Sequence, residues 1–190
     1  HSLPIHDVLN RSILALYLNG ERLPAIHGGP VRLITPGVYA TMHMKWLSEL
    51  RFVTDESTNH NHVPRYRVPH RPIMPGSEYD FKLQNSSFNW NMKTKSVLLT
   101  PGDEDRLRSG PTIIKGVAFN DGQASIASVI LSFDHGQSWQ QATLMPHTSK
   151  YGWTRFRLQK TLSAGQHSVW CRAIDSHGRS QPLEGSIAWN

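Results

Sequence analysis

The second half of the chain consists of short apolar segments that recur at regular intervals between turn residues. These segments span residues 97–99, 112–119, 126–133, 139–144, 153–158, 168–174 and 186–189. Pro101-Gly102, Asn120-Asp121-Gly122 and Asp134-His135-Gly136 stand between some of them. Seven short strands separated by such turns predict a β-sandwich of the immunoglobulin type. The expected fold class is therefore mainly β.

The first half has weaker signals for regular structure. Residues 3–9 predict a short helix, 15–18 a strand that enters the tight turn Asn19-Gly20, and 31–35 a second strand. Residues 45–53 predict a turn followed by a third strand. This mixture indicates a partial α+β domain.

A boundary between two domains is expected near residues 88–93. The preceding stretch, 69–92, holds three prolines and then the polar run 84–87, which is typical of a linker or a meandering crossover. We therefore assign residues 1–88 to the first domain and 89–190 to the second.

The composition is that of a folded protein with a basic surface. Hydrophobic residues make up 38% and charged residues 18%, with a formal net charge of +6. The Lys and Arg residues are scattered, so we expect no nucleic-acid partner. The longest apolar run, residues 13–18, is far shorter than the roughly 20 residues of a membrane span. The start of the chain does not have the pattern of a signal peptide.

Few side chains in this sequence offer metal ligands at a recognised spacing. The single cysteine, Cys171, shares one strand face with Val169 and Ala173, which indicates a packing residue and not a metal ligand. The chain has 11 histidines but no HExxH motif. His60 and His62 lie in a polar run and are interpreted as loop residues. We therefore expect no metal ligand within this chain.

The stretch from Asn19 to Trp46 is the strongest candidate for a binding site. It places Arg32 and Lys45 beside the glycines of 28–29 and 37. Glycines allow a close backbone approach, arginine grips a phosphate with two N–H groups, and lysine adds a point charge. A pocket for a phosphorylated anion and an ordinary loop with surface cations both fit this pattern, and no P-loop or dinucleotide motif decides between them.

At this point the sequence resembles the sulfite oxidase family and its plant nitrate reductase relatives. The resemblance rests on Asn19-Gly20-Glu21-Arg22-Leu23-Pro24, His27-Gly28-Gly29-Pro30-Val31-Arg32, Pro36-Gly37 and Met44-Lys45-Trp46-Leu47. It continues through residues 114–119, 132–139, 173–182 and 189–190, which resemble the dimerisation domain of that family. The matches follow one order over nearly the whole chain. The resemblance implies a sulfite oxidase-type molybdopterin-binding domain followed by an immunoglobulin-like dimerisation domain.

The resemblance also implies roles for six residues. His27, Arg32 and Lys45 would hold the phosphate and pterin of molybdopterin, with further contacts from His43 and Met44. Tyr66, twenty positions after Trp46, would lie beside the molybdenum and the substrate as the catalytic residue. Arg65 and Arg67 on either side of it would raise the local potential for anions.

Several positions depart from the family pattern. Ala40 replaces a usual glycine, and His135 replaces the first glycine of a hairpin pair. Thr154 stands where animal members have a pocket arginine, and Arg155 next to it should point to the opposite sheet face. The family's metal-binding cysteine and a substrate arginine belong to a region before the one that His1 matches. The chain is thus expected to be the C-terminal part of an enzyme whose N-terminal half supplies both.

The function implied by the resemblance is the oxidation of sulfite to sulfate. The two electrons would pass to a haem or cytochrome c, on a partner or on another part of the protein, and the chain would form a homodimer through its sandwich. In a bacterium such an enzyme would be periplasmic. Two alternatives remain open at this stage: a same-fold molybdoenzyme for another oxo-anion or a sulfoxide, and a non-catalytic interaction module.

Overall fold

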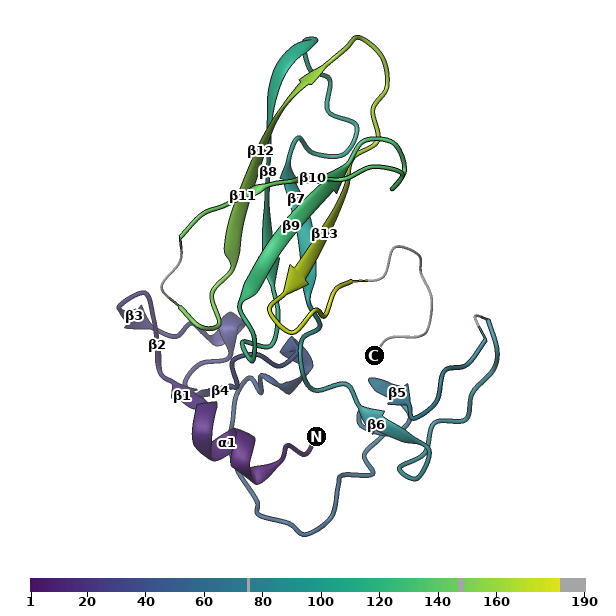
Figure 1. Cartoon of the computed structure of the whole chain (residues 1–190). Coiled ribbons are helices and arrows are strands. Elements are labelled where there is room, and N and C mark those ends of the chain that lie inside the picture. The colour runs from purple at the N-terminus through teal and green to yellow at the C-terminus, as the bar shows by residue number, and fades with distance from the viewer. Residues whose placement is uncertain (75, 147–148, 182–190) are drawn as a thin grey trace. The chain divides into compact units, whose positions relative to one another are not determined.

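A computed structural model describes residues 1–74, 76–146 and 149–181 of the chain (Figure 1). The described residues divide into two compact units. The first comprises His1–Asn91, and the second begins at Met92. Within the described residues, no helix is long and apolar enough to cross a lipid bilayer.

The second unit is a sandwich of two antiparallel sheets. One sheet has the strand order β10-β9-β13, and the other has the order β11-β12-β8-β7 (Figure 1). The strands are β7 (Lys95–Thr100), β8 (Gly110–Phe119), β9 (Ile126–Ser132), β10 (Gln140–Gln141), β11 (Thr143–Leu144), β12 (Thr154–Leu162) and β13 (Trp170–Asp175). The predicted immunoglobulin-like, mainly β fold is confirmed. The strand predicted at 186–189 lies outside the described residues.

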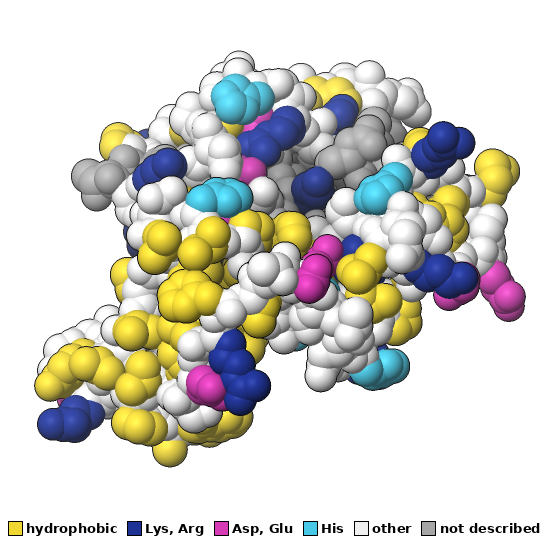
Figure 2. Space-filling view, turned by 90° about the horizontal axis from the view of Figure 1, so that it is seen from below, with side chains coloured by type: hydrophobic (Ala, Val, Ile, Leu, Met, Phe, Trp, Pro, Cys, Tyr) yellow, Lys and Arg dark blue, Asp and Glu magenta, His cyan; other side chains and the backbone are white. Residues whose placement is uncertain are grey.

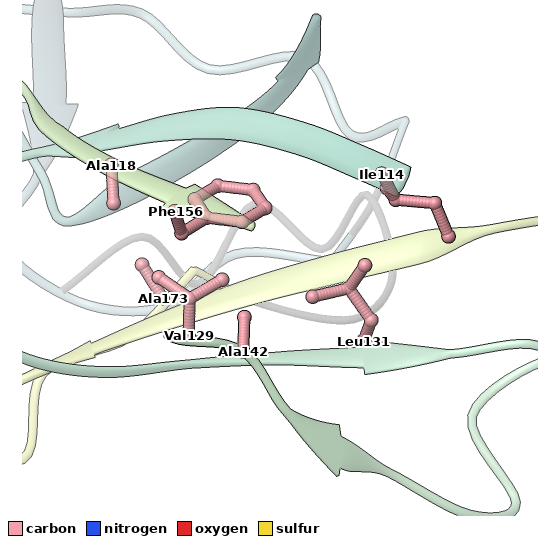
Figure 3. Packing of buried hydrophobic residues seen from close by; sticks show 7 residues of the cluster. All are labelled: Ile114, Ala118, Val129, Leu131, Ala142, Phe156 and Ala173. Atoms are coloured by element: carbon pink, nitrogen blue, oxygen red, sulfur yellow. The ribbon is translucent and has the colours of Figure 1, made fainter. Parts of the chain in front are cut away.

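Alternation of apolar and polar residues fixes which side of each strand faces the core. Along β12, Thr154 and Phe156 are buried while Arg155 and Arg157 are exposed. The register pairs Phe156 with Gly116 on β8. Figure 3 shows the resulting core between the two sheets. Its buried members are Ile114, Ala118, Val129, Leu131, Ala142, Phe156 and Ala173.

Gly116 is required by the size of the ring opposite it. A Cβ at this position would lie 2.3 Å from the Phe156 ring and 2.4 Å from the carbonyl oxygen of Val97. Neither neighbour can move without disturbing the sheet or the core, so a side chain at Gly116 would overpack the sandwich.

The segment predicted as one strand at 139–144 divides between the two sheets. Gln140 and Gln141 pair with β9, whereas Thr143 and Leu144 pair with β12. The switch occurs at Ala142, which is buried and donates its N–H to Val129 O at 2.8 Å. Ala142 therefore links the two sheets covalently at one edge of the sandwich.

A buried ionic network joins the ends of three strands of the sandwich. The Asp175 carboxylate accepts hydrogen bonds from Thr94 Oγ1 at 2.6 Å and from Arg179 Nε at 2.8 Å. The other guanidinium nitrogens of Arg179 donate to Asp121 at 2.8 and 2.9 Å. Both carboxylates are buried, with residue exposures of 2% for Asp175 and 3% for Asp121. Their buried charges are therefore compensated within the protein.

The first unit has short elements and little regular sheet. They are α1 (Ile5–Arg11), β1 (Ile13–Ala15), β2 (Tyr17–Leu18), β3 (Glu21–Arg22), the 3-10 turns η1 (Ala25–His27) and η2 (Ala40–Met42), β4 (Arg32–Ile34), β5 (Arg67–Pro69) and β6 (Ser86–Phe88). Asn19 and Gly20 both have positive φ and form the predicted tight turn between β2 and β3. The helix predicted at 3–9 is present as α1. A small buried cluster of Val38, Met42 and Phe88 holds this unit together.

One expectation for the first unit was wrong, and another is narrowed to one of its two alternatives. The third strand predicted within 45–53 is absent. Leu47 N donates a single hydrogen bond to Val31 O at 2.9 Å, and the residues after Leu47 pair with no strand. For the stretch 69–92, a linker and a meandering crossover were both predicted, and the structure favours the crossover. Strand β5, which ends at Pro69, pairs with β6 within the stretch, so that Arg67 lies opposite Phe88 and Pro69 opposite Ser86. Most of this stretch thus belongs to the first unit.

Candidate cofactor-binding site

Two loops from the predicted site pack directly against each other. The residues around η1 lie beside residues 43–47, because Trp46 N donates to Gly28 O at 3.1 Å and Trp46 Nε1 donates to Ala25 O at 2.8 Å. Gly28 has a φ of +102°, and a Cβ there would lie 2.8 Å from Lys45 Cβ. The glycine therefore permits both the turn and the close approach of Lys45.

The two predicted cations are held by main-chain carbonyl groups. Lys45 Nζ donates to Ile26 O at 2.9 Å, and an Arg32 terminal nitrogen donates to His27 O at 3.1 Å. Among the described residues neither cation has a carboxylate partner within ion-pair distance. Arg32 Nε is buried and has no hydrogen-bond acceptor in the described part of the chain. The positive charge of this pair is therefore not neutralised by the protein around it.

His43 completes this platform on the Arg32 side. One ring nitrogen, Nε2, lies 3.0 Å from Thr35 O. A carbonyl oxygen only accepts, so this nitrogen carries the proton and Nδ1 remains an acceptor when the ring is neutral. Burial lowers the pKa of His43 and the charge of Arg32 lowers it further, although the Thr35 bond opposes them. The neutral ring is thus favoured at neutral pH.

The remaining two predicted contacts take different positions. His27 is exposed at the end of η1, and its carbonyl oxygen accepts a hydrogen bond from the Arg32 guanidinium. Met44 is half-buried and contributes its carbonyl oxygen to Leu33 N at 2.9 Å. The structure thus brings His27, Arg32, His43, Met44 and Lys45 into one small platform, defined hereafter as the cation platform.

The cation platform fits an anionic, hydrogen-bonding cofactor. Two cations without acidic partners, one unsatisfied buried N–H and a neutral imidazole acceptor are the groups that a phosphate and a pterin ring would satisfy. This donor set agrees with the molybdopterin contacts that the resemblance implies.

Tyr66 lies in a different part of the first unit. Its ring is 6.4 Å from the rings of both His1 and Phe88, and no hydrogen bond or ring contact joins it to the cation platform among the described residues. The side chain is 51% exposed. Its φ is +54°, a left-handed conformation that is unfavourable for a residue with a bulky side chain. The carbonyl of Tyr66 accepts Asn89 N at 2.8 Å, which helps to hold this conformation.

The neighbourhood of Tyr66 contains a partly buried charge network that the sequence pattern does not reveal. His62 has no exposed surface and donates to Glu56 Oε1 at 2.8 Å, while Arg67 donates to the same oxygen at 2.8 Å. Arg67 also donates to Ser86 Oγ at 2.8 Å. Burial would raise the pKa of Glu56, but the bonds from Arg67 and His62 outweigh it and lower the pKa.

This network adds to one interpretation of the sequence and corrects another. His60 and His62 both lie in turns, as predicted, but His62 is a fully buried side chain stacked on the Phe88 ring at 4.3 Å. Arg67 points inward to Glu56 and does not contribute an exposed charge beside Tyr66, whereas Arg65 is exposed. No periodicity marks Glu56, His62 and Arg67 as partners, since they meet only when the loop folds.

Cys171 behaves as a packing residue, as its strand position predicts. The side chain packs against the sandwich core and accepts a hydrogen bond from Ser96 Oγ at 3.3 Å. Burial raises the pKa of the Cys171 thiol. The thiolate needed for metal binding or nucleophilic attack is therefore disfavoured.

We expect the Cys171 thiol to react slowly with a disulfide reagent in the native protein. Native protein should react about tenfold or more slowly than protein in urea, because Cys171 is half-buried in the folded strand and unfolding exposes the thiol fully and restores its ordinary pKa. The measurement is thiol titration over time, with Cys171→Ser as the blank. The same substitution should leave molybdenum content unchanged. Rapid native labelling, or a loss of molybdenum in Cys171→Ser, would contradict the packing role.

The departures from the family pattern are accommodated locally. His135 adopts a φ of +58° and is followed by Gly136 at +86°, so the hairpin turn keeps its left-handed backbone without the usual glycine. Thr154 is 2% exposed on the inner side of β12, and Arg155 is exposed on the outer side, as expected. Arg155 is thus on the opposite side of the strand from Thr154.

Comparison with known families identifies the class of protein. Residues 1–61 match the oxidoreductase molybdopterin-binding domain, and residues 86–190 match the Mo-co oxidoreductase dimerisation domain. These are the two domains expected, in the same order. The fold is thus that of molybdopterin oxidoreductases.

Individual relatives narrow the class to one family. The chain is 32% identical to the mitochondrial sulfite oxidase of Rattus norvegicus and 30% identical to that of Homo sapiens, in each case over 94% of this chain and 33% of the relative. The crystal structure of the sulfane dehydrogenase SoxCD from Paracoccus pantotrophus superposes with a TM-score of 0.79 at 28% identity. It covers 95% of this chain and 44% of that chain. The chain belongs to the sulfite oxidase family and corresponds to its C-terminal portion. It spans about a third of the length of these curated relatives.

Proposed function

We propose that this chain forms the C-terminal part of a molybdenum enzyme that oxidises sulfite to sulfate. The observation that carries the proposal is the cation platform, where Arg32 and Lys45 meet without a carboxylate partner. An anionic cofactor would neutralise both charges. Bound molybdenum cofactor would supply the oxygen-atom transfer and the two-electron redox change.

Each residue of the cation platform has a part in holding the cofactor. Arg32 and Lys45 bind the phosphate, Arg32 through its planar guanidinium and Lys45 as a point charge. His43 accepts an N–H of the pterin through Nδ1, while His27 and Met44 complete the surroundings. None of these five residues needs to change protonation during turnover.

Tyr66 is assigned to the reacting centre as a hydrogen-bond donor. Its hydroxyl can donate to an oxygen of the substrate or of the cofactor as charge develops there. The exposed ring and the left-handed backbone support this assignment, since strained conformations concentrate at functional sites. The Glu56–Arg67 pair, in which Arg67 is buried and Glu56 is partly exposed, fixes the backbone directly after Tyr66 and so positions it.

The rest of the enzyme supplies what these residues do not. The thiolate ligand of molybdenum and a substrate arginine are assigned to the part of the protein before His1. Consistent with a covering segment, Figure 2 shows hydrophobic side chains gathered on the left of the view, the side on which α1 and β1–β3 lie in Figure 1. Exposed apolar residues of these elements include Leu9, Ile13, Leu14, Tyr17 and Leu18. Contiguous exposed patches of this kind mark contact surfaces.

The proposed partners are a second copy of the chain and an electron acceptor. The dimerisation-domain match of residues 86–190 supports a homodimer through the sandwich. The oxidation of sulfite with water releases two electrons and two protons for each sulfate formed. A haem, on a partner or on another part of the protein, or a cytochrome c is the proposed acceptor.

A second candidate function is oxidation of a different reduced sulfur compound. One solved structure similar to this chain is a sulfane dehydrogenase, and Thr154 stands where animal sulfite oxidases have a pocket arginine. A hydroxyl in place of a guanidinium removes a charge that would favour the sulfite dianion.

The proposal is tested on the natural full-length protein. We expect about one molybdenum and one molybdopterin for each chain, with reduction of added cytochrome c on addition of sulfite. A protein without molybdopterin would overturn the proposal. A loaded protein that oxidises sulfane sulfur and leaves sulfite unchanged would establish the second candidate.

A further inference from the structure

The segment that carries Tyr66 is a turn whose two ends contact each other. Residues 60–66 have turn conformation, and β5 begins at Arg67. A terminal nitrogen of Arg67 donates to the carbonyl oxygen of His62 at 3.4 Å. Tyr66 thus lies between two residues that are joined directly. We call residues 62–67 the Tyr66 turn.

One oxygen atom outside the Tyr66 turn binds both of its ends. Glu56 Oε1 accepts hydrogen bonds from His62 Nε2 and from Arg67, each at 2.8 Å. The His62 and Arg67 side chains are 0% and 1% exposed, so both donors are buried. Within the described part of the chain, Glu56 is the one acid that forms an ion pair with either residue. Loss of its carboxylate would remove an acceptor from two buried donors at once.

The ionisation states of the pair suit this arrangement at neutral pH. Burial would raise the pKa of Glu56, but the bonds from Arg67 and His62 lower it, so the carboxylate is charged. Burial lowers the pKa of His62 although the bond to Glu56 opposes it, so the ring is neutral. A carboxylate only accepts, and the single proton of the neutral ring therefore lies on Nε2. His1 Nδ1 and Ser2 Oγ also face this ring, each at 3.4 Å from one of its nitrogens.

The same contacts support the Tyr66 ring and its backbone. The His62 ring stacks on Phe88 at 4.3 Å, and the Tyr66 ring lies 6.4 Å from Phe88. Phe88 is also the partner of Arg67 in the β5–β6 register. The φ of +54° at Tyr66 persists only where the surroundings impose it. His62 before Tyr66 and Arg67 after it supply that constraint, and Glu56 joins the two.

We propose that Glu56 is the positioning residue for Tyr66. Through Oε1 it holds the Tyr66 turn from both ends and keeps the phenol hydroxyl in place to donate at the reacting centre. This inference rests on the proposed catalytic role of Tyr66. It adds the anchor at His62 and identifies the atom on which the position of the phenol depends. Glu56 itself touches neither the substrate nor the cofactor.

The first experiment compares Glu56→Leu with Glu56→Gln in the full-length protein loaded with cofactor. Leucine keeps the bulk without an acceptor, whereas glutamine keeps an oxygen. Glu56→Leu should lower kcat for sulfite per bound molybdopterin by about the tenfold expected for Tyr66→Phe, with little change in KM, and Glu56→Gln should recover most of this loss. In the Tyr66→Phe background Glu56→Leu should cause no further loss, because it acts through Tyr66. Glu49→Leu is the control, since Glu49 is exposed and paired with the exposed Arg51.

The second experiment follows the Tyr66 ring without any turnover. The protein is labelled with 3-fluorotyrosine, and its fluorine NMR resonance for Tyr66 is identified by its loss in Tyr66→Phe. Glu56→Leu should shift or broaden this resonance and leave those of the other tyrosines in place. Glu49→Leu should leave the whole spectrum as in the wild type.

The outcomes separate the positioning role from the proposed function. A folded Glu56→Leu protein with an unchanged Tyr66 resonance and normal kcat would overturn the positioning role. So would a loss of kcat that is equally large in the Tyr66→Phe background. A wild type that binds no molybdopterin would overturn the proposed function, and the fluorine spectra would still decide whether Glu56 holds the Tyr66 turn.

Substitutions of His62 provide the test if Glu56→Leu does not fold. His62→Gln keeps an N–H donor for Glu56 but loses the stacked ring, whereas His62→Phe keeps a ring on Phe88 but loses the donor. The glutamine variant should retain more kcat and a Tyr66 resonance closer to that of the wild type. The reverse order would show that ring packing positions Tyr66 and that the bond to Glu56 does not.

Discussion

Replacing Asp175 with alanine should destabilise the sandwich by about 3 kcal/mol, at the lower end of the range for breaking a buried ion pair. The Asp175 carboxylate binds Thr94 Oγ1 and Arg179 Nε, and it also accepts the backbone N–H groups of His177 and Arg179 at 3.0 Å. Its loss leaves these donors without an acceptor. The value lies at the low end because the Arg179 side chain is 42% exposed and retains Asp121.

The measurement is thermal unfolding of the wild type and Asp175→Ala. A loss of this size should lower the midpoint by on the order of 10 °C in a domain of about 100 residues. Asp55→Ala is a matched control, because that carboxylate is exposed and its described hydrogen bond comes from the adjacent Thr54. It should change stability by less than about 0.5 kcal/mol. Equal effects of the two substitutions would show that the Asp175 network contributes little.

The same carboxylate should make the stability of the sandwich depend on pH. Burial would raise the pKa of Asp175, but hydrogen bonds from Thr94 and Arg179 outweigh burial and lower it. A pKa lower in the folded state than in the unfolded chain gives stability above the unfolded value of about 4, which is lost as the pH falls through the folded value. The difference in midpoint between the wild type and Asp175→Asn should thus be largest near neutral pH and shrink below about pH 4.

Local pattern was sufficient to predict the sandwich. Alternation along 153–158 identified the buried and exposed sides of β12, and the turns at 120–122 and 134–136 marked strand ends. A strand period of two residues is a direct consequence of backbone geometry, so it survives in the sequence. The switch of sheets at Ala142 was not predictable, because a single small residue between two strand-like pairs leaves no such period.

The first unit was harder to predict because its contacts are between loops. The β5–β6 pairing closes a stretch that is rich in proline and polar residues, and its composition resembles that of a linker. The Glu56–His62–Arg67 network depends on loop closure across 11 positions of sequence. The cation platform was found through its motif. The packing of Gly28 against Lys45 gives a physical reason for the glycine in that motif.

Substitution of Arg32 or Lys45 by alanine should reduce molybdopterin retention in the full-length protein about tenfold or more. Each substitution would remove one charge-assisted contact between the protein and the phosphate. Such a contact contributes roughly 1.5–3 kcal/mol to the free energy of binding. The measurement is molybdopterin content per chain after dialysis. Arg22→Ala is the matched control, since Arg22 is exposed on β3 and contacts the Tyr17 ring at 6.0 Å. Full cofactor content in both Arg32→Ala and Lys45→Ala would refute the phosphate-binding role of the cation platform.

Tyr66→Phe should have the opposite profile, with normal cofactor content and a turnover lowered by about tenfold. The ring keeps its contacts with Phe88, while the hydroxyl that donates at the reacting centre is removed. A hydrogen bond made chiefly in the transition state lowers kcat when it is lost and leaves binding unchanged. Tyr79→Phe provides the control, because it removes a hydroxyl that donates to Asn85 O at 2.8 Å elsewhere in the first unit. If Tyr66→Phe oxidises sulfite at the wild-type rate per bound cofactor, Tyr66 is not catalytic, and the resemblance would extend to the fold and cofactor but not to this residue.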